Sequence, residues 1–259
     1  MAFFAGALLS AIVAIVSVKK EKLTPYAGTA AIAVGAAIFS CAGWDAWVAL
    51  TMFFASASVT SRFKKRVEPD SASRARKVSQ VLANGLPAAL FGLVYFITGN
   101  QLFLLSPMSA IACATADTWS SDIGVLSRKK TVSILSFRAV EAGQSGGVSL
   151  LGCFTSVLGS AFIAGICVAL SYFTGGKGGA PLASFITVAI CGVFGSFADS
   201  LLGAGVQAKY RYGDKIIEQK EGRMQNAVLV SGFRIIDNDA VNLLSGLAAG
   251  GLSILFAYF

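Results

Sequence analysis

Residues 107–126, PMSAIACATADTWSSDIGVL, form an apolar stretch as long as a membrane span, yet they include two carboxylates, Asp117 and Asp122. A second apolar stretch, residues 182–206, carries Asp199 within the sequence FADSLLGA. A carboxylate near the bilayer centre costs about 2.5–3.5 kcal/mol on insertion scales, so such residues are rarely kept without a partner or a function. Small neighbouring residues let helices approach closely and leave room for a ligand. The three aspartates are therefore the first candidates for a functional site.

The composition is that of a membrane protein with several spans. Of the 259 residues, 55% are hydrophobic and 13% are charged, about half the roughly 25% usual in soluble domains. Five cysteines stand singly, without the spacing of a zinc site or a disulfide framework. The chain has no histidine, which excludes histidine-based catalysis. The expected fold class is all-α, a single integral membrane domain over residues 1–259 built as a transmembrane helical bundle.

Eight apolar stretches divide the chain, and most reach the roughly 17–25 residues of a spanning helix. They are residues 2–18, 26–43, 44–60, 79–98, 107–126, 148–173, 182–206 and 238–258. Only the segment Gly43-Trp44-Asp45 separates the second from the third. These two stretches are therefore expected either as a tight hairpin of two spans or as a partly re-entrant pair.

The basic residues alternate between the two sides of this pattern. The loops 19–25, 61–78, 127–147 and 207–237 carry 20 of the 21 Lys and Arg residues, and Lys177 is alone on the other side. The positive-inside rule assigns these four loops to the cytoplasm. Both termini are then expected outside, and the expected location is the cell (inner) membrane, with the active site facing the cytoplasm. This topology accounts for the net charge of +8 without nucleic acid as a partner.

The same topology places the carboxylates in the cytoplasmic half of the membrane. Asp117, Asp122 and Asp199 come late in spans that run inward, and Asp237 and Asp239 stand at the cytoplasmic entrance to the last span. Oxygen ligands gathered at one face suit Mg²⁺, which usually binds together with substrate phosphates. The alternative is that these acids pair with polar groups of other helices or with three arginines of the basic loops: Arg138, Arg223 and Arg234.

A glycine-rich segment before the sixth apolar stretch is a candidate phosphate site. It contains Gly143, Gly146, Gly147 and Ser149, and Arg138 precedes it. Glycines let backbone N–H groups turn toward an anion, and the start of a helix adds its positive dipole end. The pattern matches neither the P-loop nor GxGxxG, so a turn with Ser149 as the helix cap is the alternative.

Basic and amide side chains beside the spans are candidates for binding a phosphorylated ligand. The residues in this group are Lys77, Asn84, Gln207 and Arg234. The alternative is that the charges only set topology or meet anionic lipid headgroups. Acids for a metal, glycines and bases for phosphates, and apolar helices for a lipid tail together fit transfer between a nucleotide and a lipid. Phosphoryl transfer depends mostly on positioning and charge neutralisation, so it does not require a histidine.

Five segments resemble, in order, the motifs of one family. They are QVLANG (80–85), ADTWSSDIG (116–124), GQSGGVS (143–149), DSLLGA (199–204) with Gln207, and DNDAVN (237–242). The family is the integral membrane family labelled domain of unknown function 92, which includes transmembrane protein 19 and the plant and cyanobacterial phytyl-phosphate kinases. The resemblance implies a CTP-dependent kinase that converts a prenyl monophosphate, of phytyl or geranylgeranyl type, to the diphosphate. It also implies a distant similarity to polyprenol kinases and CDP-lipid synthases, which use CTP and Mg²⁺ at membrane-embedded aspartates.

Under this interpretation Asp117 and Asp199 are the principal Mg²⁺ ligands of the catalytic site. Asp122, Asp237 and Asp239 are further ligands or support them.

The nucleotide phosphates are then expected at the glycine-rich segment with Arg138. The acceptor phosphate is expected near Asn84, Lys77, Gln207 and Arg234, with its isoprenoid chain between the fourth, fifth and seventh spans.

Other functions stay open on the sequence. A cytidylyltransferase that makes a CDP-lipid, or a polyprenol kinase, would use the same metal and nucleotide groups. A transporter of a lipid or anionic metabolite would also use buried acids and glycine-rich breaks, although here the polar groups gather at one face rather than at the midplane. The expected partners are a nucleoside triphosphate, an isoprenoid lipid phosphate and membrane lipids, and a homodimer is left open.

Overall fold

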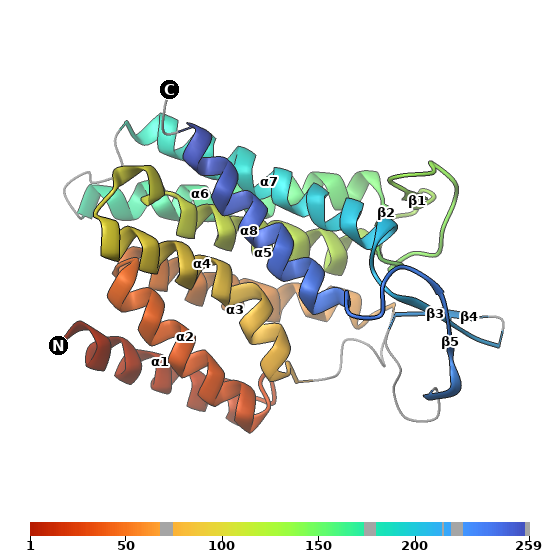
Figure 1. The fold of residues 1–259 in the computed structure, drawn as a ribbon, viewed down its shortest axis with the longest axis horizontal. Helices are drawn as coiled ribbons and strands as arrows, with labels where there is room; N and C mark the ends of the chain where they lie inside the picture. Colours follow the sequence, from red (N-terminus) through yellow and green to blue (C-terminus); the bar gives the residue numbers. More distant parts are fainter. Residues whose placement is uncertain (68–74, 174–179, 214, 219–224, 257–259) are drawn as a thin grey trace.

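The computed structural model describes residues 1–67, 75–173, 180–213, 215–218 and 225–256 (Figure 1). Lys177 and Arg223 lie outside these ranges. Within them the chain forms eight α-helices, one near each expected apolar stretch. They are α1 (Ala2–Lys19), α2 (Pro25–Cys41), α3 (Trp44–Lys64), α4 (Val78–Thr98), α5 (Ser106–Gly124), α6 (Leu150–Phe173), α7 (Pro181–Gly205) and α8 (Asn238–Phe256), with a short 3-10 turn, η1 (Gln101–Phe103), before α5. The all-α helical bundle expected from the sequence is confirmed.

Five of the helices in the described ranges are long and apolar enough to cross a membrane: α1, α4, α6, α7 and α8. Helix α2 is apolar but has only 17 residues. Helices α3 and α5 are less apolar, because more of their residues are polar or charged. The multi-pass character of the chain is therefore supported directly, whereas a crossing by all eight helices stays a prediction.

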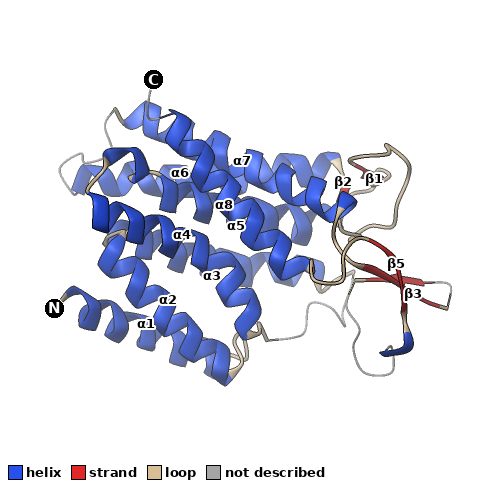
Figure 2. Cartoon of the chain, in the orientation of Figure 1, coloured by secondary structure: helices blue, strands red, loops and turns tan. Residues whose placement is uncertain are grey.

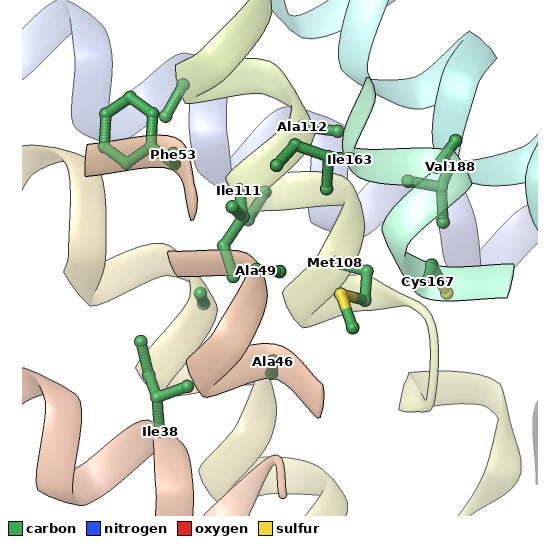
Figure 3. Close-up of a cluster of buried hydrophobic side chains, with 14 of the residues drawn as sticks. Ile38, Ala46, Ala49, Phe53, Met108, Ile111, Ala112, Ile163, Cys167 and Val188 are labelled. Carbon is green, nitrogen blue, oxygen red and sulfur yellow. The ribbon is translucent and has the colours of Figure 1, made fainter. Parts of the chain in front are cut away.

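Helix α5 lies at the centre of the bundle. It contacts α3, α4, α6, α7 and α8, and 13 of its 19 residues are buried. Its side chains Met108 and Ile111 belong to one apolar cluster with Ile163 of α6 and Val188 of α7 (Figure 3). Association of helices in lipid depends on close van der Waals packing rather than on release of water. A polar helix is tolerated at this position because neighbouring helices, and not lipid, surround it.

Helices α2 and α3 form a hairpin with a two-residue turn. Gly43 in this turn has φ +94°, in the left-handed region where glycine has no steric penalty. Trp47 of α3 packs edge-on against Phe39 of α2, with 6.1 Å between ring centroids. The Trp47 Nε1–H also donates a 2.9 Å hydrogen bond to Ser10 Oγ of α1. Of the two expected arrangements, the structure has the helical hairpin, and the depth to which each helix enters the membrane stays a prediction.

Within the described residues, five short strands lie at one end of the bundle, and the start of α1 and the end of α8 lie at the opposite end (Figures 1 and 2). Strands β1 (Val132–Ser133) and β2 (Gly147–Val148) pair antiparallel, and the second sheet has the order β4–β3–β5. Its members are β3 (Lys209–Tyr212), β4 (Lys215–Ile217) and β5 (Val228–Ser231). Most of these strand residues lie in the loops 127–147 and 207–237, for which the sequence analysis predicted no strand. These sheets position the loops over the end of the bundle where the candidate site lies.

Candidate active site

A cavity of about 160 Å³ lies at the strand end of the bundle. Asp117 of α5, Asp199 of α7 and the segment 143–147 line it, together with Lys64 of α3 and Glu218 after β4. The structure therefore brings together the two principal aspartates and the glycine-rich segment, which are far apart in the sequence. This cavity is the candidate active site.

A close helix contact positions the two aspartates. A Cβ atom on Gly195 of α7 would lie 2.8 Å from the Cβ of Cys113 on α5, so only glycine allows this approach. Residues four apart share a helix face. The contact between Gly195 and Cys113 therefore places Asp199 and Asp117, one turn further along, on the facing sides of α7 and α5. Asp199 is only 9% exposed, and Ser245 Oγ of α8 donates a 3.1 Å hydrogen bond to its Oδ2.

The segment 143–147 is a tight turn that packs on the backbone of α7. Gly143 and Gly146 have φ values of +85° and +80°, both in the left-handed region. A Cβ atom on Gly146 would lie 2.5 Å from the Cα of Ala204. Side chains at these positions would strain or displace the turn, which explains why the segment is rich in glycine.

The turn is held by a network of hydrogen bonds that was not predicted from the sequence. The Ser145 backbone N–H donates to Glu218 Oε1 at 2.6 Å, and Ser145 Oγ donates to Gln207 Oε1 at 2.8 Å. Gln207 Nε2 in turn donates to Glu218 Oε2 at 3.0 Å. Lys209 Nζ donates to the Ser145 carbonyl at 3.0 Å, and burial lowers the pKa of this ammonium against the opposing effect of Glu218. The Glu218 carboxylate thus accepts the hydrogen bond of the Ser145 N–H, a backbone donor that a phosphate oxygen would also accept from.

Gly147 and Ser149 line the same cavity, and their polar groups are used within the fold. The Gly147 N–H donates to the Gln144 carbonyl at 2.9 Å. Ser149 Oγ accepts from the Gly152 N–H at 3.1 Å and donates to the Gly124 carbonyl at 3.2 Å. Ser149 therefore caps the start of α6 and ties it to the end of α5, which is the alternative role expected from the sequence.

Asp122 is not part of the described lining of the cavity. It is buried and accepts a 2.8 Å hydrogen bond from Thr60 Oγ1 of α3. Asp122 follows Asp117 at a spacing of five positions, which at 3.6 residues per turn puts them on different faces of α5. Asp122 lies within electrostatic range both of Arg76, which precedes α4, and of Asp117.

The two acids at the start of α8 also lie outside the described lining of the cavity. Asp237 Oδ1 accepts a 2.9 Å hydrogen bond from the Ala240 N–H, as an N-cap side chain does. Asp239 sits in the first turn, where a negative charge interacts favourably with the helix dipole. Asn238, between them, does line the cavity, although no sequence pattern singled it out.

The remaining predicted residues are spread over the same end of the bundle. Arg138 and Arg234 are exposed in their loops. Lys77 is the N-cap residue of α4, and its backbone N–H donates a hydrogen bond to Gln80 Oε1. Asn84 faces a different, apolar cavity between α1, α2, α3 and α4. None of these four belongs to the described lining of the aspartate cavity, whereas Gln207 contacts it through Ser145.

The donor set fits Mg²⁺ only in the company of a phosphate ligand. Among the described residues, no three or more Asp, Glu, Cys or His side chains are grouped closely enough to hold a metal ion by themselves. Asp117 and Asp199 do face one cavity, and Mg²⁺ commonly binds through one or two carboxylates plus substrate phosphates. The residues therefore fit an ion that arrives with a nucleotide, and not a permanent protein cage of five carboxylates.

Comparison with known proteins identifies the class of protein. Residues 8–250 match the family model described as integral membrane protein DUF92, and the chain belongs to this family.

Three relatives show how widely the sequence is shared. The uncharacterized membrane protein MJ0933 of Methanocaldococcus jannaschii is 30% identical over 82% of this chain and 76% of its own length. Protein PGR of Arabidopsis thaliana is 29% identical over 97% of this chain and 95% of its own length. Protein VTE6, chloroplastic, of the same plant is 26% identical over 62% of this chain and 40% of its own length. No solved structure matches the chain.

Proposed function

We propose that the chain is a CTP-dependent kinase that converts a prenyl monophosphate to the diphosphate at the strand end of the bundle. The observation that carries this proposal is the common cavity of Asp117, Asp199 and the glycine turn, to which the basic loops 127–147 and 207–237 both contribute lining residues. The motif resemblance to the phytyl-phosphate kinases supports the substrate class. In the reaction, an oxygen of the prenyl phosphate attacks the γ-phosphorus of CTP, the β–γ bridging P–O bond breaks, and CDP leaves.

Asp117 and Asp199 would hold the Mg²⁺ of the Mg-nucleotide. When bound, this ion would neutralise charge on the β- and γ-phosphates. The two carboxylates come from different helices whose spacing is fixed by the contact at Gly195. Ser245 orients Asp199 through its hydrogen bond, so this carboxylate would not need to reorganise on binding.

The glycine turn and Lys64 would receive the nucleotide phosphates, and Lys209 would support the turn. Lys64 and the turn line the cavity, and Lys209 holds the turn through the Ser145 carbonyl. The Ser145 N–H is the donor best placed for a phosphate oxygen, but Glu218 holds it at 2.6 Å. A nucleotide would therefore bind by replacing the Glu218 carboxylate at this N–H.

A prenyl monophosphate acceptor is compatible with a site that has no histidine. A phosphate monoester has its second pKa near 6, so its attacking oxygen is already ionised at neutral pH. Positioning and charge neutralisation are then the main requirements for transfer. An alcohol acceptor would need a general base, and in a chain without histidine this role would fall to an aspartate such as Asp117 or Asp199. A monophosphate acceptor leaves both aspartates to the metal ion.

The test is a substrate screen with the purified, full-length protein. Phytyl, geranylgeranyl and farnesyl monophosphates are each incubated with Mg²⁺ and CTP, ATP, GTP or UTP, and the products are separated. Formation of prenyl diphosphate with release of CDP supports the proposal. Release of pyrophosphate identifies a cytidylyltransferase instead, and substrate flux in proteoliposomes without nucleotide turnover identifies a transporter.

A further inference from the structure

A second polar cavity, which we call the basic hollow, lies at the ends of α1 and α3 and has a volume of about 340 Å³. Among the residues that the structure describes, one carboxylate, that of Glu21, and five cationic side chains line it: Lys20, Lys22, Arg62, Lys65 and Arg76. Asp122 lies within electrostatic range of one of these cations, Arg76. Like charges repel one another, and an anion bound in the hollow would relieve the repulsion among them. Positive-inside topology explains cations at this side of the membrane, but it does not explain their gathering in one hollow.

The backbone fixes part of this charge in place. The Arg76 N–H donates to the Lys22 carbonyl at 3.0 Å, and the Thr24 N–H donates to the Arg76 carbonyl at 3.1 Å. This pairing holds Arg76 beside the loop that carries Lys20 and Lys22. The guanidinium also lies 5.4 Å from the ring centroid of Phe54, a cation–π distance.

An apolar cavity of about 80 Å³ adjoins the basic hollow between α1, α2, α3 and α4. Its wall includes Val13, Ala31 and Leu50, and Arg76 and Phe54 line both spaces. A cationic hollow that shares two wall residues with an apolar cavity matches an amphiphile with an anionic head.

Helix α3 separates this pair of spaces from the aspartate cavity. Ser58, Arg62 and Lys65 share one helix face, at spacings of four and three residues, and line the basic hollow. Thr60 and Lys64 lie on another face, where Thr60 bonds Asp122 and Lys64 lines the aspartate cavity.

We propose that the basic hollow and the apolar cavity together bind a single-chain lipid phosphate, with its phosphate among the cations and its chain between α1 and α4. A phosphate monoester carries about −1.5 to −2 at neutral pH, more than the single charge of most anionic phospholipids, and so better matches the excess of cations. The identity of the lipid rests on the proposed function, in which such a lipid is the acceptor, and the hollow would hold it beside the catalytic cavity.

The first test measures equilibrium binding of geranylgeranyl monophosphate to the full-length protein in phosphatidylcholine nanodiscs, with no nucleotide or Mg²⁺. A basic residue beside an anionic headgroup contributes about fivefold in affinity, so Arg62→Gln combined with Lys65→Gln should weaken binding about 30-fold. The matched control combines Arg128→Gln with Lys130→Gln, two exposed positions in another basic loop, and should bind as the wild type does. Equal affinity of the two double variants would overturn the proposal.

The second test uses competing ligands and needs no substitution. Inorganic phosphate, geranylgeraniol and phosphatidylglycerol should each displace the labelled lipid phosphate at least about tenfold less effectively than unlabelled geranylgeranyl monophosphate. Equal displacement by phosphatidylglycerol would overturn the assignment in favour of bulk anionic lipid, and equal displacement by inorganic phosphate would overturn the role of the apolar cavity.

The proposed kinase function and the proposed lipid phosphate site can be contradicted independently of each other. Saturable binding that depends on Arg62 and Lys65 supports the lipid site even if the protein turns over no CTP. Prenyl diphosphate formation with unchanged lipid binding in the Arg62 and Lys65 double variant would keep the kinase function and overturn the lipid site.

Discussion

Ser245 Oγ of α8 donates a 3.1 Å hydrogen bond to Oδ2 of Asp199 on α7, a bond that crosses between two helices at the edge of the candidate active site. Asp199 is 9% exposed, so few water molecules can replace this donor. The same hydroxyl lies 3.0 Å from the Asn242 carbonyl, so its single proton is shared between two acceptors. Its contact with Oδ2 restricts the orientation of the Asp199 carboxylate.

Substitution Ser245→Ala should destabilise the protein and reduce its activity. Loss of one partner of a buried polar group costs about 1–3 kcal/mol, and misorientation of Asp199 should lower kcat/KM for CTP at least about tenfold. Thermal melting in detergent and the kinase assay measure the two effects. Ser253→Ala is the control, because Ser253 is another buried serine of α8 and its Oγ lies 2.9 Å from Ser106 Oγ of α5. If Ser253→Ala lowered activity as much as Ser245→Ala, the orienting role of Ser245 would be wrong.

The substitution Gly146→Ala should weaken nucleotide binding. The backbone at position 146 has φ +80°, and the new Cβ would lie 2.5 Å from the Cα of Ala204. The turn must therefore move away from α7. The left-handed conformation alone costs a non-glycine residue about 1–2 kcal/mol. We expect a KM for CTP at least about tenfold higher. Gly165→Ala in α6 is the control, since no heavy atom lies within 4 Å of its Cβ position, and it should leave the KM unchanged. A wild-type KM in Gly146→Ala would contradict the role of the turn.

Glu218→Gln should strengthen CTP binding. The amide oxygen can still accept from the Ser145 N–H, but the negative charge that competes with phosphate is gone. A unit charge about 4 Å away contributes about 1 kcal/mol even at the dielectric constant of water, so the KM for CTP should fall about fivefold. Glu141→Gln, an exposed position in the same loop as the turn, removes the same charge as a control. A higher KM in Glu218→Gln would show that Glu218 assists the nucleotide instead of competing with it.

Asp122→Asn should retain most of its activity, in contrast to the catalytic role expected from the sequence. Asp122 bonds Thr60 and does not line the cavity, so we expect kcat/KM within about fivefold of the wild type and a loss of stability of about 0.5–1.5 kcal/mol. Thr60→Val should lower stability by a similar amount, again with little change in activity. An inactive but folded Asp122→Asn would return this residue to the catalytic group.

The helices of this fold could be predicted from the sequence because apolar length is a strong local signal. Residues 107–126 matched α5 closely, although its position at the centre of the bundle depends on contacts that no local pattern contains. The short strands were missed. Segments such as Lys209–Tyr212 and Val228–Ser231 are rich in β-formers, but four residues next to an apolar helix give a weak signal.

The sequence predicted that certain residues of the candidate site would lie together, but it did not predict the hydrogen bonds between its loops. Asp117, Asp199 and Gly146 were expected together and line one cavity. The five-residue spacing from Asp117 to Asp122 already indicated different helix faces, and this signal could have been used. Glu218 gave no signal, because its contact with Ser145 joins two loops 73 residues apart.

The measurement that tests the central claim most directly is product formation by Asp117→Asn and Asp199→Asn. Each purified variant is incubated with Mg²⁺, CTP and geranylgeranyl monophosphate, and CDP and geranylgeranyl diphosphate are quantified beside the wild type and Asp122→Asn. Loss of a charge that stabilises phosphoryl transfer should lower turnover at least about 10²- to 10³-fold in both variants, while membrane insertion and melting stay close to those of the wild type. Full activity in both variants would contradict the assignment of these two carboxylates to the Mg-nucleotide site.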